Sequence, residues 1–353
     1  MRIALLIYGS IDTVSGGYLY NRQLVDYLRR QGDSVEIISI PYRGYWHHLR
    51  DNFSQTLRKR LDALNIDVLI QDEMNHPSLV WLNGRLKRDY QVVSLVHLLK
   101  VTERLPRWLR PIYRQIEQHY LRSVDGFIVT SQTTDNDIQR RFGLHKPTVV
   151  AVPAGDRFSH RTTPTNHVLN GSLRILYVGN VIRRKGLHLV LEAMATVANT
   201  TLTIVGPTTV EPDYTQSLRT IIGRNHLQSR VQFLGPLDGD ALVTAYQQAD
   251  LFAMPAYYES FGIVYLEAMG FGLPTIGTTQ GAAHELITHG KNGYLIETDD
   301  VHALAKHLQT LCDHPKQRRQ MRDHALARFA AHPSWEASMA KVRAYLVAKI
   351  FDQ

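Results

Sequence analysis

The chain has 353 residues, the length of about two ordinary domains, and its 44% apolar and 20% charged residues exclude a disordered, collagen-like or coiled-coil protein. The single cysteine excludes a disulfide scaffold, and no apolar run reaches the roughly 18 residues of a membrane span, so we expect a cytoplasmic protein. The net charge of +8 lies almost entirely before residue 166, where 23 Lys and Arg stand against 16 Asp and Glu, compared with 17 and 16 in the remainder. This uneven charge favours an anionic partner for the first domain.

The first half of the chain alternates short β-rich runs with longer amphipathic stretches. The expected strands are Arg2–Tyr8, Ser34–Ile40, Asp67–Gln71, Gln91–His97, Gly126–Thr130 and Thr148–Val152. Helical periodicity lies between them, for example over Tyr18–Arg30 and Trp108–Arg122. Strands that alternate with helices predict a doubly wound parallel sheet.

A polar stretch from Pro153 to Ser172 interrupts this alternation and predicts an interdomain linker. The pattern then restarts, with strands expected at Leu173–Val178, Thr201–Val205, Val231–Leu234, Leu251–Met254 and Pro274–Gly277. The helices expected among them are Leu187–Ala198, Tyr214–His226, Gly239–Ala249 and Ser260–Gly270, and the end of the chain looks helical apart from a break at His332–Ser334. We therefore predict an α/β fold with two facing Rossmann-like domains, residues 1–165 and 170–333, and a ligand site in the cleft between them.

The most specific motif follows the expected strand that ends at Met254. Ser260 is a good helix N-cap, so the amides of Phe261, Gly262 and Ile263 would be free at the start of a helix. Free amides and the helix dipole form an anion site, and a glycine lets a phosphate approach the backbone closely. The sequence therefore predicts a phosphate site here.

Two glutamates of this motif, Glu259 and Glu267, stand about 12 Å apart along a helix. That separation suits one carboxylate at a sugar and another at a ribose, with a diphosphate between them. The plain alternative makes Glu267 a solvated helix residue. Apolar neighbours such as Leu266 and Met269 favour a buried carboxylate instead, and a buried carboxylate needs partners.

Three consecutive cations, Arg183, Arg184 and Lys185, lie between a strand and a helix in the second half. At a helix N-terminus each cation opposes the helix dipole by ~0.3–1 kcal/mol, which an anion bound there would offset. This indicates a second part of the phosphate site, and the alternative is a solvated basic turn.

Two features of the first half lie where parallel sheets bind ligands, at the carboxyl ends of strands. Gly16 and Gly17 link the first strand to the first helix and permit close approach to a ligand, and His97 ends an apolar strand. Each feature is common by itself, since many such turns carry glycines and a lone histidine is more often structural. His284 and His289 are one residue too far apart for a zinc motif on one helix face, so no metal site is expected.

Two glutamates separated by seven residues, on a Ser-Phe-Gly helix, resemble the family 4 retaining glycosyltransferases. Further segments similar to that family are Gly270–Ile276, Gly281–Glu285, Asn292–Leu295 and Ser334–Trp335. The similarity is close over residues 173–335 and looser over 1–170. It implies the GT-B fold, transfer of a hexosyl or N-acetylhexosaminyl group from a nucleotide-diphospho-sugar with retention at the anomeric carbon, and a final helix, residues 334–353, that crosses back to the first domain.

The resemblance also implies that the second domain binds the donor and the first domain the acceptor. We expect the acceptor to be a growing glycan or, given the basic first half, a lipid-linked molecule. The resemblance implies no metal and no cofactor besides the nucleotide sugar as co-substrate. Glu259 would orient the sugar hydroxyls and Glu267 the ribose. The other residues that it places at the donor, besides the cations of the second half, are Gly16, Gly17, His97, Gly206, Leu237, Ser260, Phe261, Gly262 and Ile263.

In the family, an arginine and a lysine hold the donor diphosphate. Lys185 matches the lysine, but Asn180 stands where the arginine is usual. Arg184 or Arg183 is therefore the expected substitute.

Residues 100–122 carry six Lys and Arg against two Glu, and Trp108, Ile112, Ile116 and Tyr120 recur at four-residue spacing. Such a helix can rest on an anionic membrane, which would place the protein at the inner face of that membrane beside a lipid-linked acceptor. The alternative is an ordinary crossover helix with its apolar stripe on the sheet.

Two other functions stay open. A nonhydrolysing sugar-nucleotide epimerase shares the two-domain fold and would convert the donor without an acceptor. A nucleic-acid-binding protein would also explain the basic charge, but no recognition helix, RNA motif or aromatic-basic platform supports it, so no nucleic-acid partner is expected.

Overall fold

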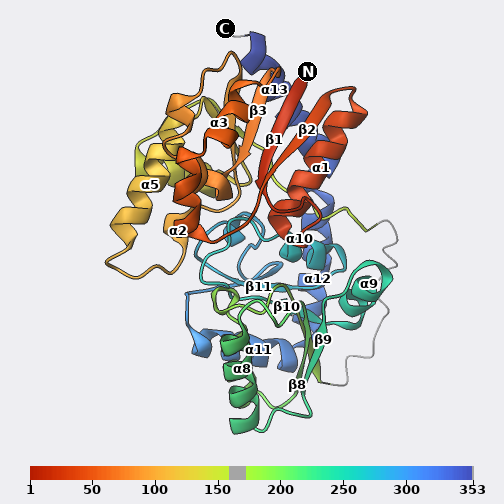
Figure 1. Cartoon of the computed structure of the whole chain (residues 1–353). Coiled ribbons are helices and arrows are strands. Elements are labelled where there is room, and N and C mark those ends of the chain that lie inside the picture. The colour runs from red at the N-terminus through yellow and green to blue at the C-terminus, as the bar shows by residue number, and fades with distance from the viewer. Residues whose placement is uncertain (159–171, 352–353) are drawn as a thin grey trace. The chain divides into compact units, whose positions relative to one another are not determined.

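The computed structural model describes residues 1–158 and 172–351 and divides into two compact units (Figure 1). The first unit is Met1–Pro153 together with the chain from Pro333 onward, and the second is Ala154–His332. The domain boundary expected between residues 165 and 170 lies outside the described residues, as does most of the expected linker. Both units are α/β with fully parallel sheets, which confirms the predicted fold class.

The first unit is built on six strands in the order β2-β1-β3-β4-β5-β6. The strands are β1 (Arg2–Tyr8), β2 (Ser34–Ile40), β3 (Val68–Asp72), β4 (Gln91–Val96), β5 (Gly126–Val129) and β6 (Thr148–Val150). All six expected strands are present, and none of their ends is shifted by more than two residues. Ile3 of β1 pairs with Val35 on one side and Val68 on the other, so β1 is a central, buried strand.

Helices cover this sheet. They are α1 (Gly16–Arg30), α2 (Tyr45–His48), α3 (Gln55–Asp62), α4 (His76–Leu79), α5 (Arg110–Ser123), α6 (Gln132–Phe142) and α13 (Trp335–Phe351), with 3-10 turns η1 (Leu49–Phe53), η2 (Glu73–Asn75), η3 (Asn83–Arg85) and η4 (Lys100–Thr102). In α13, Arg343 donates to both oxygens of the buried Asp33, and the Tyr345 hydroxyl donates to the Pro147 carbonyl. The final helix therefore packs on the first unit, as expected.

The second unit repeats this architecture, with six strands in the order β12-β11-β10-β7-β8-β9. The strands are β7 (Leu173–Val178), β8 (Thr200–Val205), β9 (Val231–Gly235), β10 (Leu251–Ala253), β11 (Thr275–Thr278) and β12 (Gly293–Ile296). The sequence predicts the first five. It misses β12, because this edge strand begins at the turn-forming pair Asn292-Gly293.

The helical elements of the second unit flank its sheet. They are η5 (Arg183–Lys185), α7 (Leu187–Thr196), α8 (Pro212–Arg224), α9 (Gly239–Gln248), α10 (Ile263–Gly270), η6 (Ala283–Glu285), α11 (Val301–Asp313) and α12 (Pro315–Ala330). The expectation that Ser260 caps α10 is wrong. Gly262 is the N-cap, and its φ of +84° lies in the left-handed region, so the helix cannot extend back to residue 260.

The core of each unit is its sheet with the side chains packed on both faces. Several large aromatic residues are fully buried there, Tyr20 and Tyr120 in the first unit and Tyr177 and Tyr265 in the second. Their hydroxyls find hydrogen-bond partners inside, as where Tyr20 donates to the carbonyl of Ala151 at 2.9 Å. Within the described residues, we find no helix with the length and apolar character needed to cross a membrane.

Candidate active site

The loops at the carboxyl ends of β7 and β10 lie side by side, because these two strands are neighbours in the second sheet. The chain leaves β7 toward β8 on one side and reaches β10 on the other, so this edge is a topological switch point, where open α/β sheets bind ligands. The loop after β7 carries Arg183–Lys185, and the loop after β10 carries Glu259. Residues that lie far apart in the sequence therefore meet here.

Lys185 and Glu259 form an ion pair between these two loops. The Lys185 ammonium donates to Glu259 Oε2, and Glu259 is only 7% exposed. Burial by itself would raise the pKa of Glu259, but the Lys185 ammonium and the Arg184 guanidinium outweigh it and hold that pKa below its ordinary value. Burial also lowers the pKa of Lys185. Glu259 is thus an ionised carboxylate with little access to water.

Backbone amides gather beside this pair at the start of α10. The Phe261 amide donates to the Glu259 carboxylate. Gly262 and Ile263 are the N-cap and first residue of the helix, where N–H groups have no partner within the helix. Ser260 is half-buried in the loop before them. The Glu259 carboxylate and the amides of Phe261, Gly262 and Ile263 therefore lie close together in one short segment of the chain.

The three consecutive cations of η5 point to different neighbours. Arg184 donates to the carbonyl of Tyr258 at 2.9 Å, beside Glu259. Arg183 is exposed instead, and its guanidinium lies 5.3 Å from the centre of the Tyr214 ring on α8. Of the two arginines that the sequence leaves as alternatives, Arg184 is the one that contacts the loop after β10.

Tight glycine contacts hold the loops of this edge in place. Gly206 follows β8 with a φ of +141°, and a Cβ atom there would lie 2.0 Å from the carbonyl oxygen of Gly179 after β7. A Cβ atom on Gly186 would lie 2.0 Å from the carbonyl oxygen of Pro255. Leu237 follows β9 at the same sheet edge and is half-buried. These loops can approach one another only because glycines stand at the contacts.

Glu267, the second glutamate of the motif, is 1% exposed and already has protein partners. Arg157 donates to both of its oxygens, at 2.5 and 3.1 Å, and the Tyr246 hydroxyl donates to Oε2 at 2.9 Å. Glu267 is thus the buried carboxylate that the sequence analysis expected, and its partners are the protein side chains Arg157 and Tyr246. The alternative of a solvated helix residue is excluded by this burial.

The first unit holds His97, Gly16 and Gly17 at the carboxyl ends of β4 and β1. The imidazole Nε2 of His97 lies 3.0 Å from Asn21 Oδ1 and 3.7 Å from Asp72 Oδ2. Burial lowers the pKa of His97, although the Asp72 carboxylate opposes this. A Cβ atom on Gly17 would lie 3.3 Å from His97 Cδ2, whereas Gly16 is exposed. His97 is therefore a neutral imidazole fixed by an amide and a carboxylate.

The sequence analysis did not identify the residues that hold the expected site residues in position. Arg157 lies in the polar stretch taken as a linker, and a lone arginine there carries no signal. Asn21 lies within a helix, so only its contact with Asp72, at 2.8 Å, shows its role. Asp72 did have a signal, since a polar residue that ends a buried strand lies at the ligand-binding edge.

One group of acidic and histidine side chains in the described part of the chain is close enough to hold a metal ion, Glu73, His76 and Glu117. It lies in the first unit and includes none of the residues expected from the sequence.

Two family models match this chain. The model described as "Glycosyl transferases group 1" matches residues 163–328, and the model described as "Glycosyltransferase Family 4" matches residues 14–155. The first match falls within the second unit, and the second falls almost wholly on the first unit.

Solved structures with similar folds include sucrose-phosphate synthase from Thermosynechococcus elongatus, with a TM-score of 0.86 and 21% identity over 99% of both chains. Another is Anabaena HepE in complex with UDP and glucose, with a TM-score of 0.81 and 19% identity over 99% of this chain and 100% of that one. At this identity they show the fold alone, the two-domain GT-B fold.

Curated relatives extend the similarity along most of the chain. A glycogen synthase from Mycobacterium tuberculosis is 26% identical over 74% of this chain and 64% of its own length. The D-inositol 3-phosphate glycosyltransferase of Corynebacterium urealyticum is 30% identical over 343 residues, 86% of this chain and 79% of the relative. With that match and a family model on each unit, the chain belongs to the family 4 glycosyltransferases.

Proposed function

We propose that this glycosyltransferase moves a hexosyl-type sugar from a nucleotide-diphospho-sugar to its acceptor, with retention of configuration at the anomeric carbon. The observation that carries the proposal is the buried ion pair of Lys185 and Glu259 at the switch point of the second sheet, with Arg184 beside it. The similar fold of HepE, solved with UDP and with UDP-glucose, supports a nucleotide sugar as the donor.

The cations would act on the diphosphate. As the sugar leaves, negative charge develops on the diphosphate, and Lys185, Arg184 and the amides of Gly262 and Ile263 would stabilise it. These groups are held in place before the reaction by the ion pair, the Tyr258 carbonyl and the helix start, so little reorganisation is needed. Such donors supply the charge that a metal ion supplies elsewhere, so the proposal requires no catalytic metal.

The carboxylates would act on hydroxyl groups. Glu259 stays ionised and accepts hydrogen bonds from hydroxyls of the donor sugar, while the Lys185 ammonium has three donors and can bind the diphosphate as well. A ribose hydroxyl can reach the buried Glu267 only after the Arg157 side chain moves, since Arg157 donates to both of its oxygens. Binding of the nucleoside would therefore displace Arg157.

The remaining expected residues are proposed to surround the donor. Gly206 and Leu237 would contact the nucleotide and its base through the backbone. In the first unit, His97 would contact the donor sugar as a neutral imidazole, and Gly16 and Gly17 would lie next to the phosphates.

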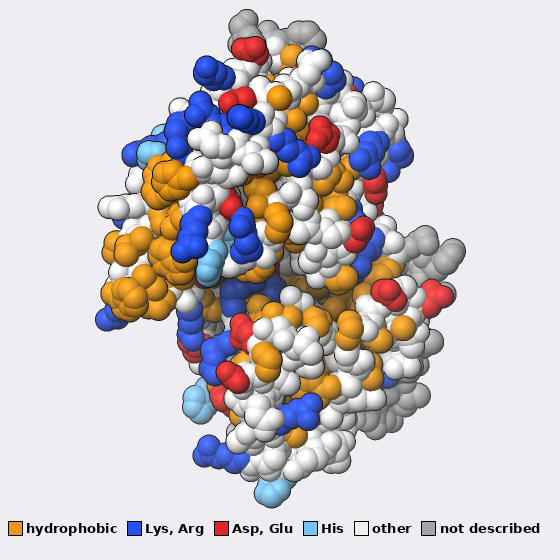
Figure 2. Space-filling view, in the orientation of Figure 1, with side chains coloured by type: hydrophobic (Ala, Val, Ile, Leu, Met, Phe, Trp, Pro, Cys, Tyr) orange, Lys and Arg blue, Asp and Glu red, His pale blue; other side chains and the backbone are white. Residues whose placement is uncertain are grey.

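The acceptor is proposed to be anionic, a glycan or a lipid-linked molecule. The first part of the chain carries a surplus of 23 − 16 = 7 positive charges, and one relative is named for an inositol phosphate. The apolar positions of α5 are divided, because Tyr113 and Tyr120 are buried whereas Ile112 is 43% exposed, and Trp108, just before the helix, is 75% exposed. Figure 2 shows hydrophobic side chains gathered on the surface near α2 and α5.

This division of α5 lets the helix pack on its unit and still present an apolar surface. Arg110 and Arg114, both exposed, accompany Trp108 and Ile112. We therefore keep peripheral contact with an anionic membrane through residues 100–122 as part of the proposal. Cosedimentation with anionic vesicles at low salt tests it: the wild type should bind, a Trp108→Ser, Ile112→Ser variant should bind more weakly, and failure of the wild type to bind overturns this part alone.

Thermal unfolding with uridine, guanosine and adenosine diphosphates, and with their sugars, tests the donor site. One nucleotide should raise the Tm of the wild type by several degrees, and Lys185→Ala should lose that shift. NMR of the donor with and without acceptors then separates transfer from epimerisation and reads the anomeric configuration of the product. Absence of any nucleotide-dependent shift, or conversion of donor without an acceptor, would overturn the proposal.

A further inference from the structure

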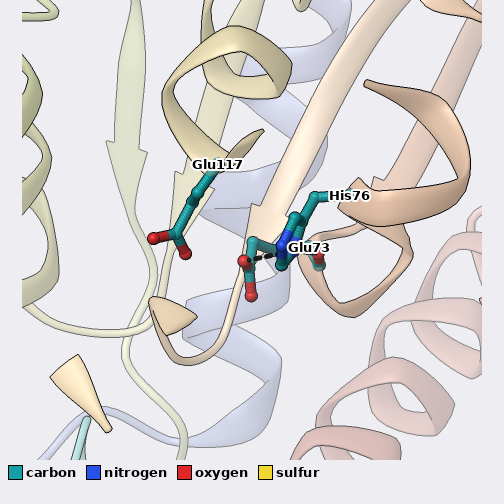
Figure 3. Close-up of side chains that lie close together, drawn as sticks. All are labelled: Glu73, His76 and Glu117. Atoms are coloured by element: carbon teal, nitrogen blue, oxygen red, sulfur yellow. Dashed lines mark hydrogen bonds and ion pairs between the residues drawn. The ribbon is translucent and has the colours of Figure 1, made fainter. Parts of the chain in front are cut away.

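A second group of titratable side chains lies in the first unit, apart from the residues proposed to bind the donor. Glu73 lies in η2, His76 is the first residue of α4, and Glu117 lies in the middle of α5 (Figure 3). They are 2%, 3% and 0% exposed. Each offers one ligand atom, and these atoms all lie within 4.8 Å of one another. Three separate segments thus bring two carboxylates and an imidazole together in the interior.

Two of the three side chains are anchored by other contacts. The oxygens of Glu117 accept the amides of Lys100 and Val101, at 2.5 and 3.1 Å. The imidazole of His76 lies 2.9 Å from the backbone carbonyl of Glu73 through Nδ1 and 2.9 Å from the hydroxyl of Tyr45 through Nε2. Each oxygen of Glu117 keeps lone pairs beyond the one its amide uses, whereas His76 would bind a metal through one ring nitrogen in exchange for that nitrogen's present contact.

Glu73 is not satisfied in the same way. Its Oε1 atom is buried and makes no hydrogen bond within the described part of the chain, although His76 Nδ1 lies 2.9 Å away (Figure 3). The neighbouring Lys100 ammonium is already bound to Glu103 at 2.5 Å. An unpaired buried carboxylate oxygen is costly, and buried charges in proteins are paired or coordinate metal ions. This oxygen therefore points to a missing partner.

The charge of the group indicates what that partner is. The Glu73 and Glu117 carboxyl groups are both buried, and the ligand atoms that they offer lie within 4.8 Å of each other. Two carboxyl groups this close resist ionising together. A divalent cation would balance both charges and use the unpaired oxygen at once.

We propose that Glu73, His76 and Glu117 bind a divalent transition-metal ion, for which Zn²⁺ is the best match. Two carboxylate oxygens and one imidazole nitrogen form a mixed donor set that suits zinc and its neighbours, whereas Mg²⁺ and Ca²⁺ prefer oxygen alone. Zinc bonds of about 2.0–2.2 Å require the three atoms to draw closer by small side-chain movements. The ion would tie η2, at the end of β3, and the start of α4 to α5.

This site has a structural role and does not depend on the proposed transfer reaction. Glu73 directly follows Asp72, which lies 3.7 Å from the His97 imidazole, so the ion would brace that edge of the sheet. The sequence gives no sign of this site, because Glu117 lies far along the chain from Glu73 and His76 and no spacing rule joins them.

Elemental analysis and thermal unfolding of the full chain test the proposal. Protein refolded in the presence of Zn²⁺ and then desalted should retain about one zinc per chain, and its Tm should exceed that of protein refolded with a chelator by about 5 °C or more. Mg²⁺ and Ca²⁺ should give no such shift. Refolding is used because Tyr45 and Lys100 cover the buried group.

Variants with a matched control identify the ligands. Glu73→Gln and Glu117→Gln should each lose the bound zinc and the zinc-dependent shift in Tm. Glu103→Gln, the same change at the neighbouring glutamate outside the group, should keep both. Wild-type protein that retains no zinc and shows no zinc-dependent Tm overturns the proposal and indicates a proton shared between the two carboxyl groups. Equal retention by all three variants overturns it as well.

Discussion

The two parallel sheets differ in strand order, with the first strand second from the edge in one and third from the edge in the other, but each holds a buried carboxylate beside its first strand, with different partners. In the first, β1 lies between β2 and β3, and in the second, β7 lies between β8 and β10, so each has a switch point beside its first strand. At the first switch point, the buried Asp72 accepts a hydrogen bond from the amide of Asn21 and lies close to His97. At the second, the buried Glu259 accepts from the ammonium of Lys185. One carboxylate is held by neutral groups and the other by a cation.

This difference indicates how each edge can respond to a ligand. The ammonium of Lys185 has three donors and can bind an anion while it keeps its carboxylate. An imidazole fixed by an amide and a carboxylate is instead suited to hydroxyl groups, to which it offers one neutral donor or acceptor. We therefore expect anion binding to depend on the second edge and the orientation of neutral groups to depend on the first.

The largest expected effect comes from breaking the ion pair of the second edge. Lys185→Ala and Glu259→Ala should each lower kcat/KM for sugar transfer by about 10³-fold, since each removes a group that is fixed in place before the reaction. Steady-state kinetics give the loss, and circular dichroism with Tm shows whether the fold is retained.

An exposed ion pair of the first unit provides the control. Arg60 and Glu36 are both about half exposed and lie 3.2 Å apart, so Arg60→Ala should change neither kcat/KM nor Tm appreciably. If the folded Lys185 and Glu259 variants keep transfer rates within threefold of the wild type, the second edge is not the donor site.

A smaller effect distinguishes the two arginines next to Lys185. Arg184→Ala should lower kcat/KM by about 10²-fold, because Arg184 contacts the loop that carries Glu259. Arg183→Ala should lower it by less than threefold, because that guanidinium lies over the Tyr214 ring. Measured under the same conditions, the opposite order would assign the diphosphate to the outer face of η5.

The fold could be predicted from the sequence because parallel strands buried on both faces form apolar runs of distinctive length. Eleven of the twelve strands were predicted, and the exception is the edge strand Gly293–Ile296, which begins at the turn-forming pair Asn292-Gly293. The short helices α2 and α4 were not predicted from the sequence, because four residues are too few to show a helical period. Their positions are fixed by tertiary contacts, such as the hydroxyl of Tyr45 on His76.

The two sites differ in how much of them the sequence reveals. At the second edge the expected residues lie in two contiguous motifs. Lys185 meets Glu259 because the two strands that precede these motifs, β7 and β10, are paired in the sheet. At the first edge the residues come from separate elements, and His97 alone gives no hint of Asn21 or Asp72. The partner of Glu267 was unpredictable for the same reason, since Arg157 lies far along the chain from it.

A change at the first edge should have a moderate effect on transfer alone. A Cβ atom in Gly17→Ala would press on the His97 ring, which already lies in a fixed position, at 3.3 Å. We expect kcat to fall by about tenfold, while Tm changes little because alanine favours the helix. In the matched control Gly223→Ala, on a helix where nothing lies within 4 Å of the new Cβ atom, Tm should rise slightly and kcat should stay unchanged.

The smallest expected effect is a difference in acid sensitivity between the two edges. Burial holds the pKa of His97 below 6.5, so its contribution to the free energy of unfolding is complete above about pH 6.5 and is lost as the pH falls through the lower folded-state pKa. The lowered pKa of Glu259 has the same sign, but its loss begins only below about pH 4.5. Mild acid should therefore loosen the first edge before the second.

Amide hydrogen exchange at pH 7.5 and pH 5.5 measures this order, because it resolves the ends of β4 and β10 separately. One proton contributes at most about 1.4 kcal/mol per pH unit, so protection at the end of β4 should fall by no more than about tenfold per unit while β10 stays unchanged. His76 is also buried with a lowered pKa, so the decisive comparison is with His97→Gln, which should reduce the pH dependence at β4. If His97→Gln leaves that dependence intact, His97 is not held neutral by its surroundings, and the contrast between a neutral first edge and a charged second edge fails.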